Sequence, residues 1–462
     1  MTVPDMFPVS SSQLAPAMAA PSTPTLATAD GSTESVDPNR PMQFSLLYFS
    51  SNEAEFSERK YRLLLEGAKF ADRHGFTAVW VPERHFHPFG GLYPNPSVLA
   101  SALAMVTERI RLRAGSVVLP MHHPVRVVEE WAVVDNLSRG RVDLALAAGW
   151  NANDFVLAPT NYANRYGLLF SGLETVRLLW RGETVTLPGG LGHEVPVRVY
   201  PAPWQPELTT WITCSGGLER FIQAGEHGAN VLTALLFQSV EELAEKIAAY
   251  REARARHGHD PADGHVTLML HTFVGDDLEE VRRTVRGPFI TYLESSVDLW
   301  QNASKPLADL TPAEREEVLA YAFERYFQTS ALFGTPQTCA PFVARLQAVG
   351  VDEIASLIDF GIEADTTLDG LHALNLLRKH CQRTPLTGHE AAARTVVGAS
   401  NDPSIRSDGA KSEHADQTAQ RLTPAWGNED GLSWIALAPP PVEQASNHGE
   451  PTAEAKPGQS QG

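Results

Sequence analysis

Residues 110–150 read IRLRAGSVVLPMHHPVRVVEEWAVVDNLSRGRVDLALAAGW and hold a complete strand, helix and strand. Two β-rich runs, Ile110 to Leu119 and Val142 to Ala148, flank an amphipathic stretch from Pro124 to Leu137. Proline suits the first helical position because its fixed φ matches the helix and its missing N–H is not needed there. Ser138-Arg139-Gly140 then ends the helical pattern. The stretch therefore predicts one βα unit of a parallel sheet.

The same alternation continues on both sides of this unit. After the first β-rich run, Leu64, Ala68 and Ala71 recur at helical spacing, and a further helix is expected from Pro96 to Thr107. Helical patterns follow every β-rich run. The eight expected strands are Gln43 to Phe49, Phe76 to Val81, Ile110 to Leu119, Val142 to Ala148, Thr210 to Cys214, Ala229 to Thr233, Val266 to Val274 and Glu353 to Asp359.

Eight βα units in sequence predict an α/β fold of the (β/α)₈ TIM-barrel type, for which about 250 residues are typical and insertions are common. The segment from Glu183 to Tyr200 is expected to be an inserted hairpin, and residues 275–334 an inserted helical lid region. The alternative is a doubly wound sheet, but the chain lacks the glycine fingerprint of a dinucleotide-binding unit.

The two ends of the 462-residue chain differ in composition from its middle. Residues 1–40 are rich in Pro, Ser, Thr and Ala and have no Lys or Arg before Arg40, so they match no secretory signal and predict a disordered leader. Residues 385–462 are again rich in Pro, Gly and Ser and predict a disordered tail. The folded domain is therefore expected to span residues 41–384.

Charge and composition exclude several classes of partner. Lys and Arg total 37 against 55 Asp and Glu, and the net charge of −18 disfavours nucleic acids and anionic membranes as partners. No run approaches the roughly 18 apolar residues of a membrane span. Three cysteines without close spacing indicate reduced thiols, so a cytoplasmic location is expected. A local basic pocket remains compatible with this composition.

Reactive groups of a (β/α)₈ barrel lie at the carboxyl ends of its strands. In this chain those ends carry histidines, amides and glycines. They read Glu83-Arg-His-Phe-His after the second strand, Pro120-Met-His-His after the third, Gly149-Trp-Asn-Ala-Asn-Asp after the fourth and Ser215-Gly-Gly after the fifth.

An anion site is expected where the fifth strand meets its helix. Ser215, Gly216 and Gly217 precede a helix whose N–H groups point at this turn, and Arg220 adds a positive charge. A simple tight turn explains the three residues equally well. Arg165, a cation after the fourth strand of an acidic chain, favours a phosphate held between the two segments.

Histidines near the other strand ends allow two interpretations. His85 and His87 form the H-x-H pattern of metal-dependent hydrolases, but Ser215 and Thr233 stand near the positions where those enzymes carry further histidines. We therefore expect no metal site, and keep the metal hydrolase as an unlikely alternative. His122 and His123 stand beside Pro124 and are interpreted as loop or helix-start residues, with a functional role as the alternative.

From Met42 to about Arg383 the chain resembles the bacterial luciferase-like flavin monooxygenases, most closely the branch found in natural-product assembly lines. Each matching segment is weak alone, whereas all of them in order are specific. They are Val81-Pro-Glu-Arg-His-Phe, Gly91-Leu-Tyr-Pro-Asn-Pro, Gly115-Ser-Val-Val-Leu-Pro-Met-His-His-Pro, Leu137-Ser-Arg-Gly-Arg-Val-Asp and Gly149-Trp-Asn-Ala-Asn-Asp-Phe.

The resemblance implies a barrel that takes reduced FMN from a separate flavin reductase and reacts it with O₂. By position, Gly115-Ser116 falls where the family has a non-proline cis peptide under the flavin ring. The family's flavin-phosphate site falls on Arg165 and on the turn of Ser215, Gly216, Gly217 and Arg220. A homodimer is the family expectation.

The candidate catalytic residues are Glu83, Arg84, His85 and Asn151. Luciferase has two histidines where this chain has Arg84 and His85, so His85 is the candidate for proton transfer. Luciferase also has a phosphate-binding Arg where Ala148 stands, which gives Arg165 more of that role. Candidates for keeping water out are Trp80, Phe86, Trp150 and the 275–334 insertion. Core packing is the alternative for the three aromatic residues, and it is favoured for Trp80, which stands within a strand.

The resulting hypothesis is a cytoplasmic FMN-dependent monooxygenase of secondary metabolism. It would oxygenate an acyl or aminoacyl intermediate held on a carrier protein, by hydroxylation or by Baeyer–Villiger insertion. A deazaflavin-dependent oxidoreductase on the same barrel and a flavin-binding scaffold protein without turnover are the alternatives.

Overall fold

The computed structural model describes residues 40–49, 60–88, 90–235, 238–300 and 311–383. The predicted leader, apart from Arg40, and the whole of the predicted tail lie outside these residues. Eight of the described strands pair in parallel and close into a barrel, because β8 pairs with both β7 and β9. They are β1 (Gln43–Leu47), β2 (Ala78–Val81), β3 (Arg111–Val118), β4 (Val142–Ala147), β7 (Thr210–Thr213), β8 (Asn230–Ala234), β9 (Val266–Val274) and β11 (Glu353–Leu357).

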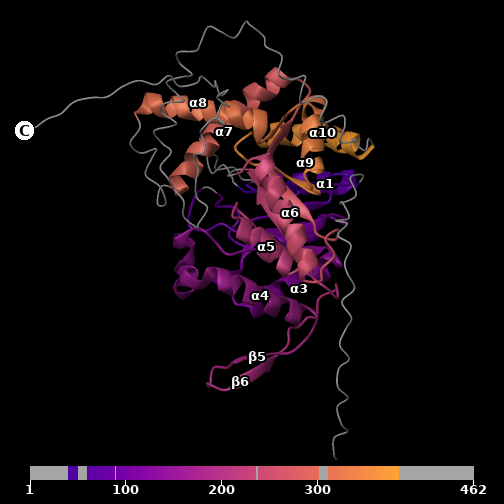
Figure 1. Cartoon of the computed structure of the whole chain (residues 1–462), viewed down its shortest axis with the longest axis vertical. Coiled ribbons are helices and arrows are strands. Elements are labelled where there is room, and N and C mark those ends of the chain that lie inside the picture. The colour runs from indigo at the N-terminus through magenta and orange to yellow at the C-terminus, as the bar shows by residue number, and fades with distance from the viewer. Residues whose placement is uncertain (1–39, 50–59, 89, 236–237, 301–310, 384–462) are drawn as a thin grey trace, which may run out of the picture. The chain divides into compact units, whose positions relative to one another are not determined.

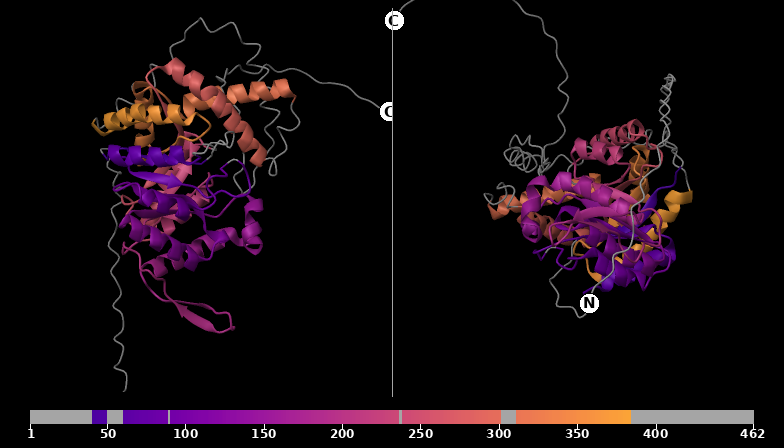
Figure 2. Two further views of the ribbon diagram at one scale, coloured as in Figure 1. Left: turned by 180° about the vertical axis from the view of Figure 1, so that it is seen from behind. Right: turned by 90° about the horizontal axis from the view of Figure 1, so that it is seen from below.

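Seven of these strands lie within their predicted runs, and β8 extends one residue beyond its run, to Ala234, so the predicted (β/α)₈ barrel is confirmed. Helices surround the strands in all views (Figures 1 and 2). Their bounds are α1 (Arg62–His74), α2 (Pro96–Ala104), α3 (Pro124–Ser138), α4 (Arg165–Trp180), α5 (Leu218–Glu226), α6 (Val240–Arg256), α7 (Leu278–Trp300), α8 (Pro312–Thr329), α9 (Pro336–Ala348) and α10 (Ala364–Arg383). Three short 3₁₀ segments follow β3 and β4, at Leu119–Met121, Ala152–Leu157 and Pro159–Asn164.

Local sequence sets the ends of these helices. The ring of His123 caps α3 by accepting from the N–H of Val125 at 3.3 Å, and Arg139 ends the helix at φ 58°. Ser239 and Glu242 form a capping box at the start of α6, with bonds of 3.2 and 2.8 Å. The prediction that Ser138-Arg139-Gly140 would end α3 is therefore confirmed.

Alternating side chains divide the apolar interior into two layers. In β1, Phe44 and Leu46 pack outward against the helices, whereas Leu47 points into the barrel. In β9, Leu270 packs outward and Phe273 faces the inner cluster. The inner cluster continues from the barrel into α7 and α8, so these two helices pack against its interior.

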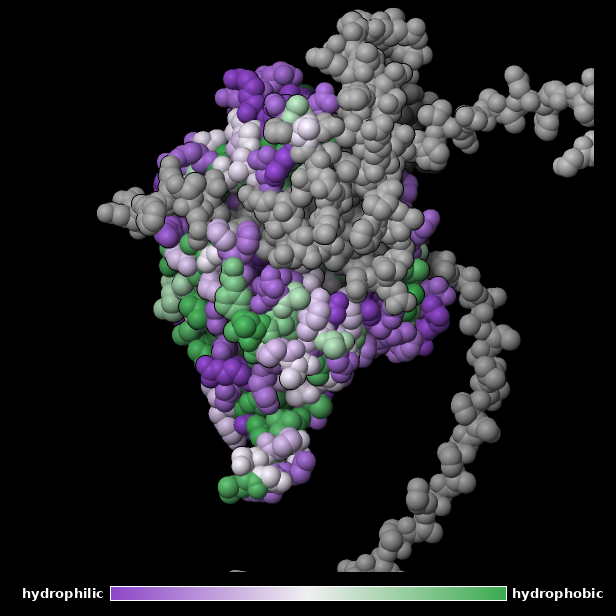
Figure 3. Space-filling model, turned by 90° about the vertical axis from the view of Figure 1, so that its left-hand side faces the viewer, coloured by the Kyte–Doolittle hydropathy of each residue, from purple (hydrophilic) through white to green (hydrophobic). Residues whose placement is uncertain are grey.

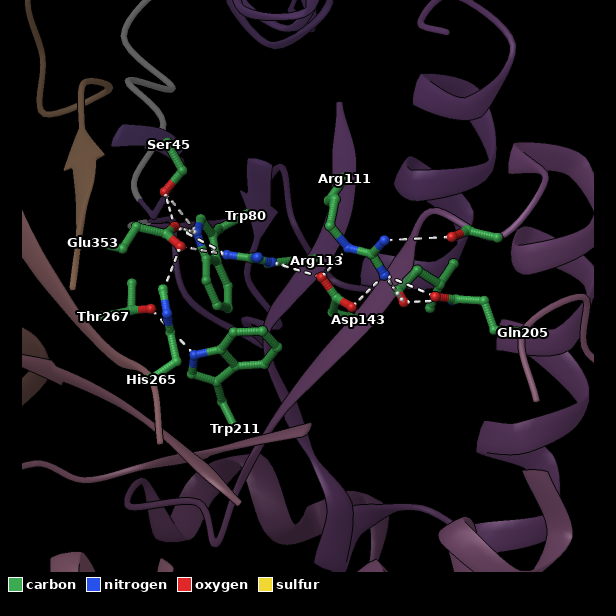
Figure 4. Close-up of polar contacts among 12 residues, drawn as sticks. Ser45, Trp80, Arg111, Arg113, Asp143, Gln205, Trp211, His265, Thr267 and Glu353 are labelled. Carbon is green, nitrogen blue, oxygen red and sulfur yellow. Dashed lines mark hydrogen bonds and ion pairs between the residues drawn. The ribbon is translucent and has the colours of Figure 1, made fainter. Parts of the chain in front are cut away.

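A buried charged network fills the amino-terminal end of the barrel (Figure 4). The guanidinium of Arg113 donates to Glu353 at 2.8 and 3.0 Å and to Asp143 at 2.8 Å. His265 and the indole of Trp80 also bond to Glu353, at 3.1 and 3.2 Å. These residues lie at the starts or middles of their strands, away from the carboxyl ends, where barrel enzymes have their reactive groups.

Two insertions extend the barrel. The predicted hairpin is confirmed as antiparallel β5 (Val185–Pro188) and β6 (Glu194–Val197), and it projects from the barrel (Figure 1). Its tip is hydrophobic (Figure 3), with Leu191 89 % exposed. The second insertion holds α7 and α8, and also the unpredicted strand β10 (Leu332–Gly334), which pairs with the end of β9. Its role as a lid stays a prediction.

The structure also bears on the predictions about the cysteines and about membrane-spanning segments. Cys214, Cys339 and Cys381 are buried and not joined in a disulfide. Among the described helices, none combines the length and hydrophobicity that crossing a membrane requires.

Candidate active site

Glu83 is the centre of the polar cluster at the carboxyl ends of β2 and β3. Its Oε1 accepts from Nε2 of His122 at 2.6 Å and from Nε2 of His85 at 2.9 Å. Its Oε2 accepts from the backbone N–H of Val118 at 2.8 Å. One buried carboxylate therefore holds two imidazole rings and fixes the end of the neighbouring strand.

The charges in this cluster stabilise one another. Burial opposes ionisation of Glu83, but hydrogen bonds from His122 and His85 outweigh it and lower the pKa of the carboxyl. Burial likewise opposes the charge of His122, yet the bond to Glu83 raises the pKa of its ring above the ordinary value. The cluster can therefore keep a proton on His122 Nε2, next to His85.

The contact between His122 and Glu83 corrects the sequence interpretation. His123 does begin α3, as predicted. His122, however, is more than a loop residue, since its ring reaches Glu83 and lines a cavity of about 130 Å³ bounded by Leu119, Pro120, Asn161 and Leu168. Its place at the end of a barrel strand was the signal in the sequence that favoured a role at this site.

Arg84 lies on the other side of the same segment. Its guanidinium carbon lies 4.9 Å from the centre of the Phe49 ring and 5.4 Å from that of Trp150. Burial lowers the pKa of Arg84, and the charge of Asp154 partly offsets this effect. Arg84 is thus a buried cation between aromatic rings, and it does not join His85 on Glu83.

Asn151 positions an acidic side chain near this cation. Its Nδ2 donates to Asp154 Oδ1 at 2.8 Å, and its oxygen accepts from the N–H of Asn153 at 3.1 Å. Burial raises the pKa of Asp154, while the charges of Arg84 and His85 oppose the rise. Asn151 therefore acts through Asp154 in the described structure, and its predicted catalytic role stays a prediction.

Two predicted phosphate-binding arginines meet on one ring. Arg165 is the first residue of α4, and its guanidinium carbon lies 4.8 Å from the ring centre of Tyr166. The guanidinium carbon of Arg220 lies 3.8 Å from the same centre. Tyr166 was not identified from the sequence, although it stands directly after Arg165. Segments 55 residues apart thus place two cations side by side.

The start of α5 completes this cationic cradle, which we define as Arg165, Arg220 and the turn Ser215–Gly217. Gly217 is the residue before the helix and offers no side-chain cap, and the space beside its Cα is open. Gly216 has a φ of 150°, which favours glycine. Uncapped N–H groups at a helix start attract anions. The cradle thus has the donor set for a phosphate group.

The backbone within β3 has the special feature that the resemblance implies. The Gly115–Ser116 peptide is cis, as the resemblance implies. The Ser116 hydroxyl bonds to that of Thr213 at the end of β7. Gly115 faces the buried Trp80, since a Cβ on it would lie 3.1 Å from Trp80 Cβ.

The aromatic residues expected to keep water out have different surroundings. Phe86 is 64 % exposed and its ring centre lies 5.5 Å from that of His85, so its covering role stays a prediction. Its backbone φ of 54° lies in the left-handed region, which a non-glycine residue rarely adopts. Trp80 is fully buried inside the barrel, and Trp150 lies against Arg84.

The described residues contain no group of three or more His, Cys, Asp or Glu side chains arranged to hold a metal ion. In particular, His85 is bonded to Glu83. The reactive groups at the carboxyl ends are instead a carboxylate with two imidazoles, a buried cation and the cationic cradle.

This arrangement is that of a (β/α)₈ barrel with polar and cationic side chains gathered at the carboxyl ends of its strands. Residues 42–353 match the family described as luciferase-like monooxygenase, and the chain belongs to that family. It is accordingly a flavin-dependent monooxygenase of the luciferase-like type.

Known proteins similar to this chain include one curated relative and two solved structures. The oxygenase component of flavin-dependent trigonelline monooxygenase from Acinetobacter baylyi is 26 % identical over 334 residues, which is 70 % of this chain and 90 % of the relative. The oxygenating constituent of 3,6-diketocamphane monooxygenase from Pseudomonas putida, in complex with FMN, superposes with a TM-score of 0.62 at 18 % identity, covering 75 % of this chain and 99 % of that one. An F420-dependent secondary alcohol dehydrogenase superposes at 0.54 and 16 %, covering 72 % and 97 %.

Proposed function

We propose that this protein is the oxygenase component of a two-component system, which receives reduced FMN from a separate reductase. The observation that carries the proposal is the cationic cradle, which lies at the same barrel end as the Glu83 cluster. The relative from Acinetobacter baylyi is itself an oxygenase component. Reduced FMN supplies the electrons that activate O₂.

The residues present fit FMN. Arg165 and Arg220 would bind its phosphate together with the N–H groups at the start of α5. The Gly115–Ser116 segment, where the strand has no bulky side chain, would support the ring. The phosphate site is supported by the meeting of two arginine side chains and an uncapped helix start in a chain that is otherwise acidic.

The Glu83 cluster would handle protons during oxygenation. Glu83 holds a proton on His122 Nε2 and orients His85, which also interacts electrostatically with Asp154. We assign His85 the transfer of a proton and Glu83 its orientation. Arg84, lying against Phe49 and Trp150, would fix a polar group of the substrate in an otherwise apolar wall.

The proposed reaction is the oxygenation of an acyl or aminoacyl intermediate of secondary metabolism, by hydroxylation or by Baeyer–Villiger insertion. The 3,6-diketocamphane enzyme, which shares the fold, is a Baeyer–Villiger monooxygenase. We further propose that the acyl group is presented on a carrier protein.

FMN and riboflavin together test the cradle, because they differ by the phosphate alone. Wild-type protein should bind FMN much more tightly than riboflavin. Arg220→Ala should weaken FMN binding about 10- to 150-fold, corresponding to about 1.5–3 kcal/mol for a hydrogen bond to a charged group, and leave riboflavin binding unchanged. Arg256→Ala is the matched control, since Arg256 is 60 % exposed and pairs only with Glu252 among the described residues, at 3.5 Å. Equal affinities for FMN and riboflavin in the wild type would refute the phosphate site.

Turnover tests the reaction and the carrier separately. The protein is mixed with FMN, a flavin reductase, NADH and ¹⁸O₂, and the product is examined for one heavy oxygen atom. One acyl group is offered both as a carrier-protein thioester and as an N-acetylcysteamine thioester. Labelling with both substrates supports oxygenation without a need for the carrier, whereas labelling with neither contradicts the proposed substrate class.

Two alternatives give different results in the same experiments. A deazaflavin-dependent oxidoreductase would bind F420 in preference to FMN and turn over without O₂; the barrel it would need is shared by the F420-dependent dehydrogenase. A flavin-binding scaffold would bind FMN without labelling any product, and His85→Ala would leave its function unchanged.

We also propose a homodimer built on α2 and α3. These helices pack against each other. Val98 and Ala102 of α2 and Met105, the residue after it, are exposed, as are Val133 and Leu137 of α3. An exposed apolar stripe across two adjacent helices favours contact with a second copy. Met105→Glu should convert the dimer to a monomer in analytical ultracentrifugation. A monomeric wild type would contradict the proposal.

A further inference from the structure

His271 occupies an aromatic box that the proposed chemistry has not yet used. It lies in β9, where its neighbours Leu270 and Thr272 are also buried. Its ring centre lies 4.6–5.8 Å from four aromatic ring centres, and each of these rings is turned by 78–86° relative to it. These rings belong to Phe289 and Tyr292 of α7, Tyr326 of α8 and Phe360 after β11.

The imidazole carries an unsatisfied polar atom. His271 is 2 % exposed, and its Nε2 finds no hydrogen-bonding partner among the described residues. A buried polar group without a partner costs about 1–3 kcal/mol. Burial also lowers the pKa of His271 to about 3, so the ring is neutral at physiological pH. A neutral imidazole can donate one hydrogen bond to a neutral acceptor.

The box borders the candidate active site. Tyr292, one wall of the box, interacts electrostatically with Arg84, and this interaction helps to support the charge of the arginine. Arg84 follows Glu83 in the chain and lies against Phe49 and Trp150. The unsatisfied atom is thus separated from the buried cation by a single aromatic side chain.

We propose that His271 Nε2 donates a hydrogen bond to the carbonyl oxygen of the substrate, and that an aromatic or conjugated group attached to that carbonyl packs against the aromatic side chains of the box. The four rings present edges and faces that suit a planar apolar body. This inference rests on the proposed function and narrows its substrate class to aryl or conjugated acyl groups.

Acetophenone and cumene test the hydrogen bond, because they have similar shapes and only the first has a carbonyl. Their dissociation constants are measured by calorimetry with the full-length wild type, His271→Phe and Thr272→Val. Thr272 is the matched control, since it is the next residue of β9 and its hydroxyl bonds to Leu270 O at 2.8 Å. The preference for acetophenone over cumene should fall about tenfold, or 1.4 kcal/mol, in His271→Phe and stay unchanged in Thr272→Val.

A second measurement keeps the inference testable if His271→Phe fails to fold. In wild-type protein labelled with ¹⁵N-histidine, acetophenone should shift the Nε2 resonance of His271, and cumene should leave it in place. An unchanged preference in a folded His271→Phe, an unmoved resonance, or no binding of acetophenone to the wild type would each overturn the inference.

The FMN-to-riboflavin ratio is measured on the same variants to separate the two proposals. His271→Phe should leave that ratio unchanged. Loss of the carbonyl preference with FMN binding intact supports the inference, whereas equal binding of FMN and riboflavin would contradict the proposed function and leave the carbonyl site standing.

Discussion

Replacing Glu353 with Gln should destabilise the barrel, because it removes the central charge of the buried network. Glu353 is fully buried and accepts from Arg113 at 2.8 and 3.0 Å and from His265 at 3.1 Å. Breaking a buried ion pair by removing one partner costs about 3–5 kcal/mol. Gln keeps the volume and Asp143 still holds Arg113, so the lower end, about 3 kcal/mol, applies.

Thermal unfolding measures this loss. With an unfolding entropy of about 2.1 cal/mol/K per residue over the roughly 340 residues from β1 to α10, about 3 kcal/mol corresponds to a fall in Tm of about 4 °C. Glu241→Gln is the matched control, since the Glu241–Arg345 pair lies on the surface with the carboxylate side chain 69 % exposed. An exposed pair contributes about 0–1 kcal/mol, so its Tm should change by about 1 °C or less.

The pH dependence gives an independent check. Burial opposes ionisation of Glu353, but the charge of Arg113 and the bond from His265 outweigh it and hold the pKa well below its ordinary value. A depressed carboxyl pKa contributes stability that is present above the unfolded-state pKa, about 4.3, and is lost as the pH falls through the folded-state value. The Tm difference between wild type and Glu353→Gln should therefore shrink below about pH 4. A Tm within 1 °C of wild type at pH 7 would refute the reasoning.

Three further predictions concern the site and its frame. Glu83→Gln should lower the pKa of His122, because the carboxylate is what raises it, and an NMR titration that shows an unchanged His122 would contradict the proposed cluster. Gly115→Ala should destabilise the protein by about 1–3 kcal/mol in thermal unfolding, since its Cβ would lie 3.1 Å from Trp80 Cβ. A variant as stable as the wild type would mean that the Trp80 side chain can move to make room for the methyl group. Ser239→Ala should cost about 1 kcal/mol by removing the cap of α6, and it should leave FMN binding unchanged, whereas a loss of FMN affinity would show that α6 influences the cradle.

Much of the fold was predictable because the relevant signals are local. Apolar alternation fixes which residues of a strand face the core, and proline and glycine mark where helices begin and end. The runs around β3 and β4 and the helix from Pro124 were therefore predicted within a few residues of their observed bounds. The ends of the predicted strands also indicated where the candidate site lies, since parallel strands bring their carboxyl ends to one end of the barrel.

Charged residues inside apolar strands were a signal that the sequence interpretation did not use. Arg113, Asp143 and Glu353 stand in strands that are otherwise apolar, which indicates partners inside the barrel. Their pairing could not be assigned, because Arg113 and Glu353 are 240 residues apart and meet only when the barrel closes.

Some residues of the candidate site could be identified from the sequence, whereas their contacts with one another could not. Sequence position and resemblance identified Glu83, His85 and the two arginines of the cradle as candidates. The contact of His122 with Glu83 depends on how the segment after β3 turns back over β2, and the shared contact with Tyr166 depends on the packing of α4 beside α5.

By itself, then, the sequence determined the order of strands and helices, the edge of the barrel at which polar groups gather and the family to which the resemblance points. These follow from side-chain periodicity and backbone preference, which act over a few residues. Tertiary structure alone decided the partners of each buried charge and left His271 Nε2 without a partner among the described residues. The reason is physical, since a hydrogen bond requires two atoms within about 3 Å, and only the closed barrel sets such distances between residues far apart in the chain.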